Sequence, residues 1–192
     1  MHFSKGRIRI IGGQYRSRLL RVAPRPGLRP TPDRVRETLF NWLGQDLDGL
    51  ACLDLYAGSG ALGFEAASRG ASRVVMVETD HVALRALEAS RTALGAAQVE
   101  IIGGSASAYL EHSRERFDVV FLDPPFRQNA VPDLLPRLRP LLKPRSRVYA
   151  ESASPVPAQA NWLELKRARA GGVSYQLFEW DGNDPSGVPG NV

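Results

Sequence analysis

The sequence predicts an α/β fold with one mostly parallel, seven-stranded sheet that carries helices on both faces. Three observations indicate it. From residue 50 onward, short apolar runs alternate with segments of helical periodicity, as in βαβ units. A glycine-rich loop follows the first of these runs. The last two runs flank Gly171-Gly172, which is typical of an antiparallel hairpin that closes the sheet.

Hydrophobic periodicity gives the elements of this sheet in order. Strands are expected at short runs of apolar, often β-branched residues: 50–55, 72–78, 98–102, 117–122, 146–151, 162–170 and 173–180. Helices are expected where apolar residues recur with helical spacing: 61–69, 81–94, 105–111 and 132–142. Ligands of such sheets bind at the carboxyl ends of the strands, so the loops that follow the strands are the place to look for a site.

The N-terminal residues form a separate small unit in this prediction. Residues 7–22 carry basic and apolar side chains around Gly12-Gly13, which is typical of a β-hairpin with a Gly-Gly turn and exposed arginines. Thr31 predicts the N-cap of a following helix, with Pro32 at the first helical position. Three segments result: a basic arm and linker over 1–30, the main domain over 31–180 and a disordered tail over 181–192.

Positive charge is concentrated at the N-terminus. Residues 1–36 contain ten Lys or Arg and one acid, a net charge of +9, so the rest of the chain carries −4. A basic arm on a mildly acidic body is typical of a polyanion binder, and arginine favours bidentate phosphate contacts. Contacts to nucleic-acid phosphates are expected from the arginines of the arm, the linker and the first helix: Arg7, Arg9, Arg16, Arg18, Arg29, Arg34 and Arg36.

The remaining composition is that of an ordinary globular protein. A length of 192 residues with 43% hydrophobic content suits one domain with a full core. No run approaches the roughly 18 apolar residues of a membrane helix, and no signal core follows the N-terminus. The three histidines are scattered and indicate no metal site. Cys52 is the only cysteine and lies in an apolar strand pattern as a packed thiol, so we expect a cytoplasmic protein.

A glycine-rich loop joins the first strand of the sheet to its first helix. Gly58, Gly60 and Gly63 fit the G-x-G-x-x-G pattern and Glu78 ends the next strand, which taken alone favours a dinucleotide such as NAD. Asp54 at the mouth of the loop argues against a dinucleotide, because its carboxylate would repel a pyrophosphate. The same charge would attract the ammonium and sulfonium of S-adenosylmethionine, whereas Glu78 suits the ribose of either cofactor.

A second motif ends the fourth strand, where Asp123-Pro124-Pro125-Phe126 follows the buried run 117–122. Neither proline has a backbone N–H to donate to a neighbouring strand, and each fixes its own φ at about −65°. The carbonyl oxygens of Asp123 and Pro124 are therefore expected at a stiff turn, beside a carboxylate and an aromatic ring. Such a turn can accept hydrogen bonds from an amino group and stack a flat ring, which suits the exocyclic amine of a nucleobase.

The predicted topology brings the two motifs together. In a doubly wound sheet the first and fourth strands are neighbours across the switch point. Asp54 and Gly58-Ser59-Gly60 should therefore face Asp123 across a shared edge of the sheet. A methyl donor would then lie beside a pocket for a planar amine, an arrangement that uses both motifs, whereas a dehydrogenase uses only the first.

These residues resemble a known class of enzymes. Asp54 with Gly58-Ser59-Gly60, together with Asp123-Pro124-Pro125-Phe126, is similar to the motifs of the Rossmann-like class I S-adenosylmethionine-dependent amino-methyltransferases. The stretches 8–13 and 28–43 resemble one branch, the bacterial 16S rRNA guanine-N2 methyltransferases of the RsmD type. The resemblance spans roughly residues 7–180. It implies methylation of a guanine N2 amine in 16S rRNA, either naked or within the assembling or assembled small ribosomal subunit.

The resemblance also implies roles for particular residues. Catalytic roles fall on Asp123, Pro124, Pro125 and Phe126. Cofactor contacts fall on the glycine-rich loop and the ends of the neighbouring strands: Asp54, Tyr56, Ala57, Gly58, Ser59, Gly60, Glu78, Ser105, Ala106 and Asp123. Related enzymes often carry an acid after the third strand that binds the adenine amino group, whereas this chain reads Gly103-Gly104-Ser105-Ala106-Ser107. Ser105 or a backbone carbonyl takes that contact, or packing holds the adenine. We expect a monomer without a metal.

Three alternatives remain open at this point. A DNA adenine-N6 methyltransferase shares the amine pocket but should need a target-recognition insertion, for which the chain shows no room. A non-catalytic RNA-binding protein on the same fold is countered by the intact Asp54, Gly58, Gly60 and Asp123. An NAD-linked enzyme would be separated by comparing the binding of the two cofactors.

Overall fold

A seven-stranded sheet organises the computed structural model, which describes residues 7–22, 31–125, 130–157 and 159–182. The strand order is β5-β4-β3-β6-β7-β9-β8. The first five strands of this order pair in parallel, whereas β9 runs antiparallel to β7 and to β8. The strand bounds are β3 (Ala51–Asp54), β4 (Arg73–Glu78), β5 (Val99–Gly103), β6 (Phe117–Leu122), β7 (Leu142–Ser152), β8 (Trp162–Ala170) and β9 (Val173–Trp180).

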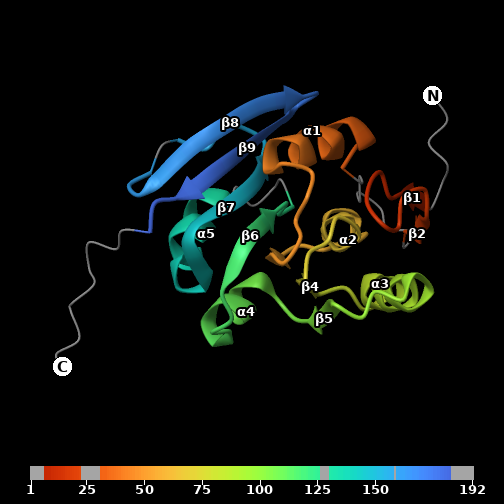
Figure 1. Cartoon of the computed structure of the whole chain (residues 1–192). Helices are drawn as coiled ribbons and strands as arrows, with labels where there is room; N and C mark the ends of the chain where they lie inside the picture. The colour runs from red at the N-terminus through yellow and green to blue at the C-terminus, as the bar shows by residue number, and fades with distance from the viewer. Residues whose placement is uncertain (1–6, 23–30, 126–129, 158, 183–192) are drawn as a thin grey trace.

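Five helices pack on the two faces of the sheet in the described part of the chain. Their bounds are α1 (Asp33–Leu43), α2 (Ala61–Ser68), α3 (His81–Leu94), α4 (Ala106–His112) and α5 (Val131–Leu138). Figure 1 shows α1, α2 and α3 on one side of the sheet and α4 and α5 on the other. Two buried apolar clusters correspond to these two faces: Phe40, Phe64 and Phe121 belong to one, and Val120, Leu122 and Leu135 to the other. Burial of this apolar area is the main stabilising contribution to the fold.

The elements of the sheet confirm the predicted alternation, with one shift. The expected helix 132–142 divides into α5 and a 3-10 turn over Arg139–Leu141, and β7 begins already at Leu142. Pro136 lies inside α5 and Pro140 inside the 3-10 turn. Each proline removes a backbone N–H donor, so the α-helical ladder cannot continue to residue 142. The strand is therefore longer than predicted and the helix shorter.

The N-terminal arm is a hairpin, but its turn differs from the predicted one. Arg7–Arg9 (β1) pairs antiparallel with Leu19–Arg21 (β2), so the connection is much longer than Gly12-Gly13. The two glycines instead approach α2: Gly13 has φ +73°, and a Cβ there would lie 1.7 Å from the carbonyl oxygen of Ser68. The Gly-Gly pair therefore allows the arm to lie on a helix, which requires a residue without a side chain.

Candidate active site

The two sequence motifs lie at adjacent strand ends, as predicted. Strand β3 pairs in parallel with β6, with Asp54 opposite Phe121. The ladder continues past β3, because the N–H of Leu55 donates to the carbonyl of Phe121 at 3.2 Å. Asp123 follows β6 at the same edge, close enough for the charge of Asp54 to raise the pKa of its carboxyl. The glycine-rich loop and the Asp-Pro-Pro turn therefore lie next to each other at one edge of the sheet and together form the candidate site.

The glycine-rich loop is shaped by backbone conformations that favour glycine. Gly60 is the N-cap of α2 with φ +77°, in the left-handed region. A Cβ on Gly60 would lie within 2.7 Å of Phe64 and Leu87, so this position also requires close packing against α2 and α3. Ala57 is buried, and Gly58 and Ser59 are half-buried. The loop thus forms a narrow surface at the C-terminal edge of β3.

Two carboxylates of the protein accept hydrogen bonds from backbone N–H groups of this loop and of the helix that follows it. Glu78 Oε2 accepts from the N–H of Gly58 at 2.9 Å, and Asp54 Oδ2 accepts from the N–H of Gly63, in the first turn of α2, at 3.1 Å. Dinucleotide-binding folds use N–H groups at this place to hold a pyrophosphate. Here they bind carboxylates, whose charge would repel an anion. The site therefore fits a cationic cofactor without phosphates and argues against NAD.

Burial makes the carboxyl group of Asp54 a weaker acid than usual. Its pKa rises from 3.8 to about 7, chiefly because burial disfavours the charged carboxylate. Hydrogen bonds from the backbone N–H groups of Gly63 and Tyr56 oppose the rise, and the charge of Glu78 adds to it. A positively charged ligand beside Asp54 would favour its ionised form.

The remaining predicted cofactor residues border the same edge. Tyr56 is half-buried, and burial raises the pKa of its hydroxyl. Glu78 Oε1 accepts from the N–H groups of Thr79 and Asp80, each at 2.8 Å, which fixes the carboxylate at the end of β4. Ser105 is the N-cap of α4, with its Oγ accepting from the N–H of Ala108 at 3.1 Å. Because a hydroxyl oxygen has two lone pairs, this cap still permits a second hydrogen bond at Ser105.

The two prolines of the Asp-Pro-Pro turn line a small hollow at the ends of β6 and β7. Pro124 is buried and Pro125 exposed, and both border the hollow together with Val131 of α5 and Glu151 of β7. Burial raises the pKa of the Asp123 carboxyl well above its usual range, and the charges of Glu151 and Asp54 raise it further. Phe126, the predicted stacking residue, lies outside the described residues.

Thr31 has a different partner from the predicted one. The N-cap of α1 is Pro32, one residue later than expected, and no side chain caps the helix. The hydroxyl of Thr31 instead lies 3.5 Å from Oδ2 of Asp123, to which it donates a weak hydrogen bond. The start of α1 is thereby attached to the site, so the threonine that the sequence indicates as a cap contacts the acid of the second motif.

Glu151 and Tyr149 belong to the site and were not predicted. Glu151 is 5% exposed and accepts a hydrogen bond from the Tyr149 hydroxyl at 2.8 Å. Because β7 pairs in parallel with β6, with Leu122 opposite Ala150, Glu151 lies beside Asp123 at the ends of the two strands. A carboxylate at the end of the run Val148-Tyr149-Ala150-Glu151 was the available signal.

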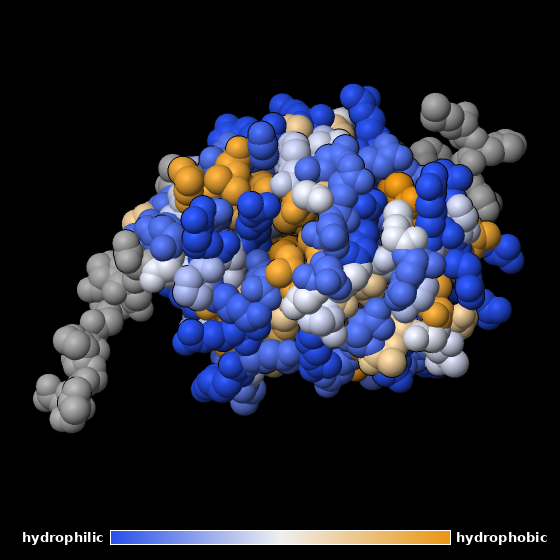
Figure 2. Space-filling model, viewed as in Figure 1, coloured by the Kyte–Doolittle hydropathy of each residue, from blue (hydrophilic) through white to orange (hydrophobic). Residues whose placement is uncertain are grey.

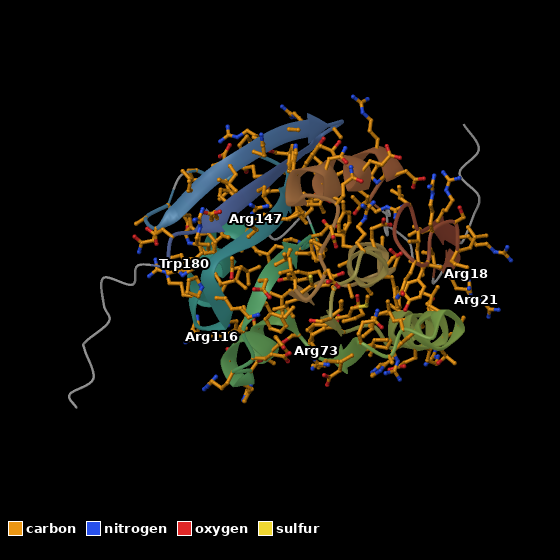
Figure 3. All side chains as sticks on the ribbon, in the orientation of Figure 1. Arg18, Arg21, Arg73, Arg116, Arg147 and Trp180 are labelled. Carbon is orange, nitrogen blue, oxygen red and sulfur yellow. The ribbon has the colours of Figure 1, made fainter. Side chains whose placement is uncertain are left out.

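The basic arm is exposed, with one correction. Arg7, Arg9, Arg16, Arg18 and Arg34 are exposed, as an RNA-binding surface requires. Arg18 and Arg21 extend from the hairpin on the side of α3, and Arg18 donates to the carbonyl of Ala93 at 2.8 Å (Figure 3). Hydrophilic residues cover most of the face viewed in Figure 2. Arg29 lies outside the described residues.

The prediction that Arg36 contacts RNA is wrong. Its side chain is fully buried, with Nη1 at 3.3 Å from Oε2 of Glu65 and Nη2 at 2.7 Å from Oδ1 of Asp33. Nη2 also donates to the carbonyl of Arg9 at 2.9 Å. Arg36 therefore joins β1 to α1 and α2. The prediction did not foresee that the arm and α2 cover the side of α1 that carries Arg36.

No helix in the described part of the chain is long and apolar enough to cross a membrane. Within the same segments, no group of three His, Cys, Asp or Glu side chains is placed to hold a metal ion. Cys52 is buried, which raises its pKa to about 12 and confirms that it is a packed thiol.

Comparison with known proteins gives matches over most of the chain. Residues 8–179 match the family model described as "Conserved hypothetical protein 95". Ribosomal RNA small subunit methyltransferase D of Escherichia coli K12 is 40% identical over 183 residues, which are 93% of this chain and 92% of that protein. The protein of the same name from Haemophilus influenzae is 42% identical over 184 residues, 92% of this chain and 95% of that one.

Solved structures agree with this result. The structure described as putative methyltransferase yhhF from Escherichia coli superposes with a TM-score of 0.84 at 39% sequence identity. The superposition covers 93% of this chain and all of the other chain. The Rossmann-like methyltransferase fold implied by the sequence motifs is therefore confirmed, including the antiparallel hairpin at the end of the sheet.

Proposed function

Since the chain belongs to the family described as "Conserved hypothetical protein 95", which includes the ribosomal RNA small subunit methyltransferases D, we propose that it methylates 16S rRNA. The proposed reaction transfers a methyl group from S-adenosylmethionine to the exocyclic N2 amine of a guanine. The observation that carries the proposal is the pairing of β3 with β6, which sets a loop suited to a cationic cofactor beside a turn suited to an amine.

The proposed cofactor site fits the chemistry of its donors. S-adenosylmethionine supplies an electrophilic methyl group on a cationic sulfur. Asp54 and Glu78 place negative charge at the ends of β3 and β4, where an ammonium and a ribose diol find acceptors. The loop residues are assigned to contact the cofactor closely through their backbone: Tyr56, Ala57, Gly58, Ser59 and Gly60. Ser105 and Ala106 at the start of α4 are assigned to the adenine.

In the proposed mechanism, the Asp-Pro-Pro turn positions the target amine. The Asp123 carboxylate and the Pro124 carbonyl accept its two N–H groups, which favours a pyramidal nitrogen with an available lone pair. The rate gain then comes from positioning and electrostatics. The methylated nitrogen loses a proton to Asp123 or to water. Pro125 and Phe126 form the wall for the base, and stacking contributes about 1–3 kcal/mol. The base must be unpaired or extruded to enter.

The proposed RNA surface is the arm together with the first turn of α1. Its exposed cations are Arg7, Arg9, Arg16, Arg18 and Arg34, to which Arg29 of the linker is added. Arg34 lies one helical turn from Thr31, which contacts Asp123, so phosphate contacts there would hold a nucleotide near the turn. The proposed substrate is 16S rRNA or the small ribosomal subunit, reached in the cytoplasm by a monomeric enzyme.

Cofactor binding and group transfer together test the proposal. Calorimetry should show binding of S-adenosylmethionine and none of NAD. Methyl label should then pass from the cofactor to undermethylated small subunits or to naked 16S rRNA, but not to duplex DNA. Binding of NAD in place of S-adenosylmethionine, or label in duplex DNA alone, would contradict it. Cofactor binding without transfer to any rRNA form would favour a non-catalytic RNA-binding protein.

A further inference from the structure

Two carboxylates lie side by side at the ends of neighbouring strands. Leu122 of β6 is opposite Ala150 of β7 in a parallel ladder, so Asp123 and Glu151 are the next residues on the two strands. They follow Phe121 and Tyr149 by two residues, and therefore share their face of the sheet. Glu151 lines the same small hollow as Pro124 and Pro125, the two residues that follow Asp123.

Among the residues that the structure describes, no Lys, Arg or His forms an ion pair with Asp123 or Glu151. Thr31 offers one hydroxyl proton, which can serve only one of the two carboxylates at a time. Burial raises the pKa of both carboxyls, and the nearby charge of Glu151 raises the pKa of Asp123 further. When both groups are ionised, they present more acceptor oxygens than the hydroxyls of Thr31 and Tyr149 can satisfy.

Tyr149 fixes the orientation of Glu151. Its hydroxyl donates to Oε1 of Glu151 at 2.8 Å, and both side chains are almost fully buried. This hydrogen bond engages Oε1, so Oε2 is the oxygen that remains for a donor from the hollow. A carboxylate held in this way can discriminate between bases, because its direction is set before the base arrives.

The purine bases differ at the atom next to the reactive amine. Guanine carries an N1–H donor beside its N2 amine, so its edge presents adjacent donors. Adenine and 2-aminopurine carry an unprotonated N1 acceptor beside the amine. A second carboxylate next to Asp123 complements the adjacent N1–H and N2–H donors of guanine. It disfavours adenine and 2-aminopurine, because the carboxylate and the unprotonated N1 would be two acceptors that face each other without a proton.

We propose that Glu151 is a specificity-determining residue that accepts a hydrogen bond from guanine N1–H while Asp123 accepts from the N2 amine. This assignment rests on the proposed function and adds a reason why the site selects guanine. It predicts that the preference for guanine depends on the charge and orientation of Glu151, separately from cofactor binding.

The test compares two bases at the target position in wild-type and variant enzymes. The product is first mapped, and 16S rRNA with guanine or 2-aminopurine at that position is made by ligation and assembled into small subunits. Both bases carry the reactive 2-amino group, but only guanine has N1–H. In Glu151→Gln, Tyr149 still donates to the side-chain oxygen, so the new amide N–H faces the hollow and suits an unprotonated N1.

We expect Glu151→Gln to lower kcat/KM for guanine by roughly 10–100-fold and to raise it for 2-aminopurine, so that the preference collapses or inverts. The Kd for S-adenosylmethionine and the melting temperature should stay near wild type. Glu179→Gln is the matched control, since Glu179 pairs with Arg145 near the opposite end of the β7–β9 ladder and should leave the preference unchanged. Tyr149→Phe is a second variant that tests the inference if Glu151→Gln does not fold. It keeps the carboxylate of Glu151 but removes the hydrogen bond that orients it, so the preference for guanine over 2-aminopurine should become smaller.

The outcomes separate this inference from the proposed function. Equal losses for both bases in Glu151→Gln and Tyr149→Phe would mean a structural role and would overturn the inference alone. A raised Kd for S-adenosylmethionine with an unchanged base preference would assign Glu151 to the cofactor, which also overturns it. Failure of the wild-type enzyme to form N2-methylguanosine would overturn the proposed function, and this inference with it.

Discussion

Arg36 Nη1 lies 3.3 Å from Glu65 Oε2, and both side chains are fully buried where the arm, α1 and α2 meet. The same carboxylate of Glu65 accepts from the N–H groups of Ile11 and Gly12, each at 2.8 Å. Arg69, one turn further along α2, donates to Oε1 of Glu65 at 2.9 Å. One buried carboxylate thus holds the arm, which carries most of the proposed RNA contacts, against the domain that carries the proposed cofactor site.

Replacing Glu65 should release the arm. Glu65→Ala leaves Arg36 buried beside only one remaining carboxylate and deprives two backbone N–H groups of their acceptor. The free energy of unfolding should fall by about 3–5 kcal/mol, which denaturant titration can measure. Amide exchange at Ile11 and Gly12 should accelerate well beyond that of β6. Glu37→Ala, an exposed residue on α1, is the control and should change neither. Unchanged exchange at Ile11 and Gly12 in Glu65→Ala would show that Glu65 does not hold the arm.

Charge reversal at Arg34 should weaken RNA binding in a salt-dependent manner. Each phosphate contact releases counterions when the RNA binds, so losing one contact reduces the number released. The slope of log Kd against log salt should therefore decrease by about one in Arg34→Glu. Binding of S-adenosylmethionine should not change. Lys166→Glu, an exposed residue of β8, provides a comparison with the same change of charge. An identical slope in wild type and Arg34→Glu would remove Arg34 from the RNA surface.

Asp54 should make stability depend on pH. Its pKa is raised from 3.8 to about 7 in the folded protein, so the folded state binds the proton more tightly than the unfolded state. The resulting stabilisation is fully present below the unfolded pKa and is lost as the pH rises through about 7. Asp54→Asn has no titrating carboxyl at this position and therefore lacks this pH-dependent contribution to the free energy of unfolding.

Unfolding free energies of wild type and Asp54→Asn test this sign. The wild-type value minus the variant value should decrease between about pH 4 and pH 7 and stay level above pH 7. The variant should also bind S-adenosylmethionine more weakly at pH 8, where the wild-type carboxylate is charged. A difference that is constant across this pH range would mean that Asp54 has an ordinary acidity in the folded protein.

Asp123 should be needed for turnover and not for cofactor affinity. In Asp123→Ala the target amine loses an acceptor, whereas Asp54, Glu78 and the glycine-rich loop are unchanged. We expect loss of methyl transfer with a near-normal Kd for S-adenosylmethionine, measured by calorimetry and single-turnover label transfer. Loss of cofactor binding with near-normal turnover at saturating cofactor would instead place Asp123 among the cofactor ligands.

The fold was predictable because its signals are local and repeated. Strand β6 and helix α3 match their predicted bounds, since buried apolar runs and helical spacing carry them without help from distant residues. The end of α5 was mispredicted, because apolar spacing continued through Pro136 and Pro140 although the helical ladder did not. Local periodicity indicates where a segment is buried, but hydrogen bonding decides where a helix ends.

The site was predictable where two motifs fall on neighbouring strands, and less so where distant segments meet. The placement of Asp54 near Asp123 follows from the topology of the sheet. The contact of Thr31 with Asp123 joins residues 92 positions apart, and its sequence signal is that of an N-cap. Arg36 looked like an exposed cation because its partner Glu65 lies on another helix. Glu151 was missed because its strand ends in no recognisable motif.

The identity of the methylated nucleoside tests the central claim most directly. Undermethylated small subunits are incubated with the enzyme and labelled S-adenosylmethionine, and the rRNA is digested to nucleosides and separated by mass spectrometry. The account predicts that the label appears as N2-methylguanosine in 16S rRNA and that Asp123→Ala abolishes it. Label found in another nucleoside, such as N6-methyladenosine, would contradict the proposed guanine chemistry at the Asp-Pro-Pro turn.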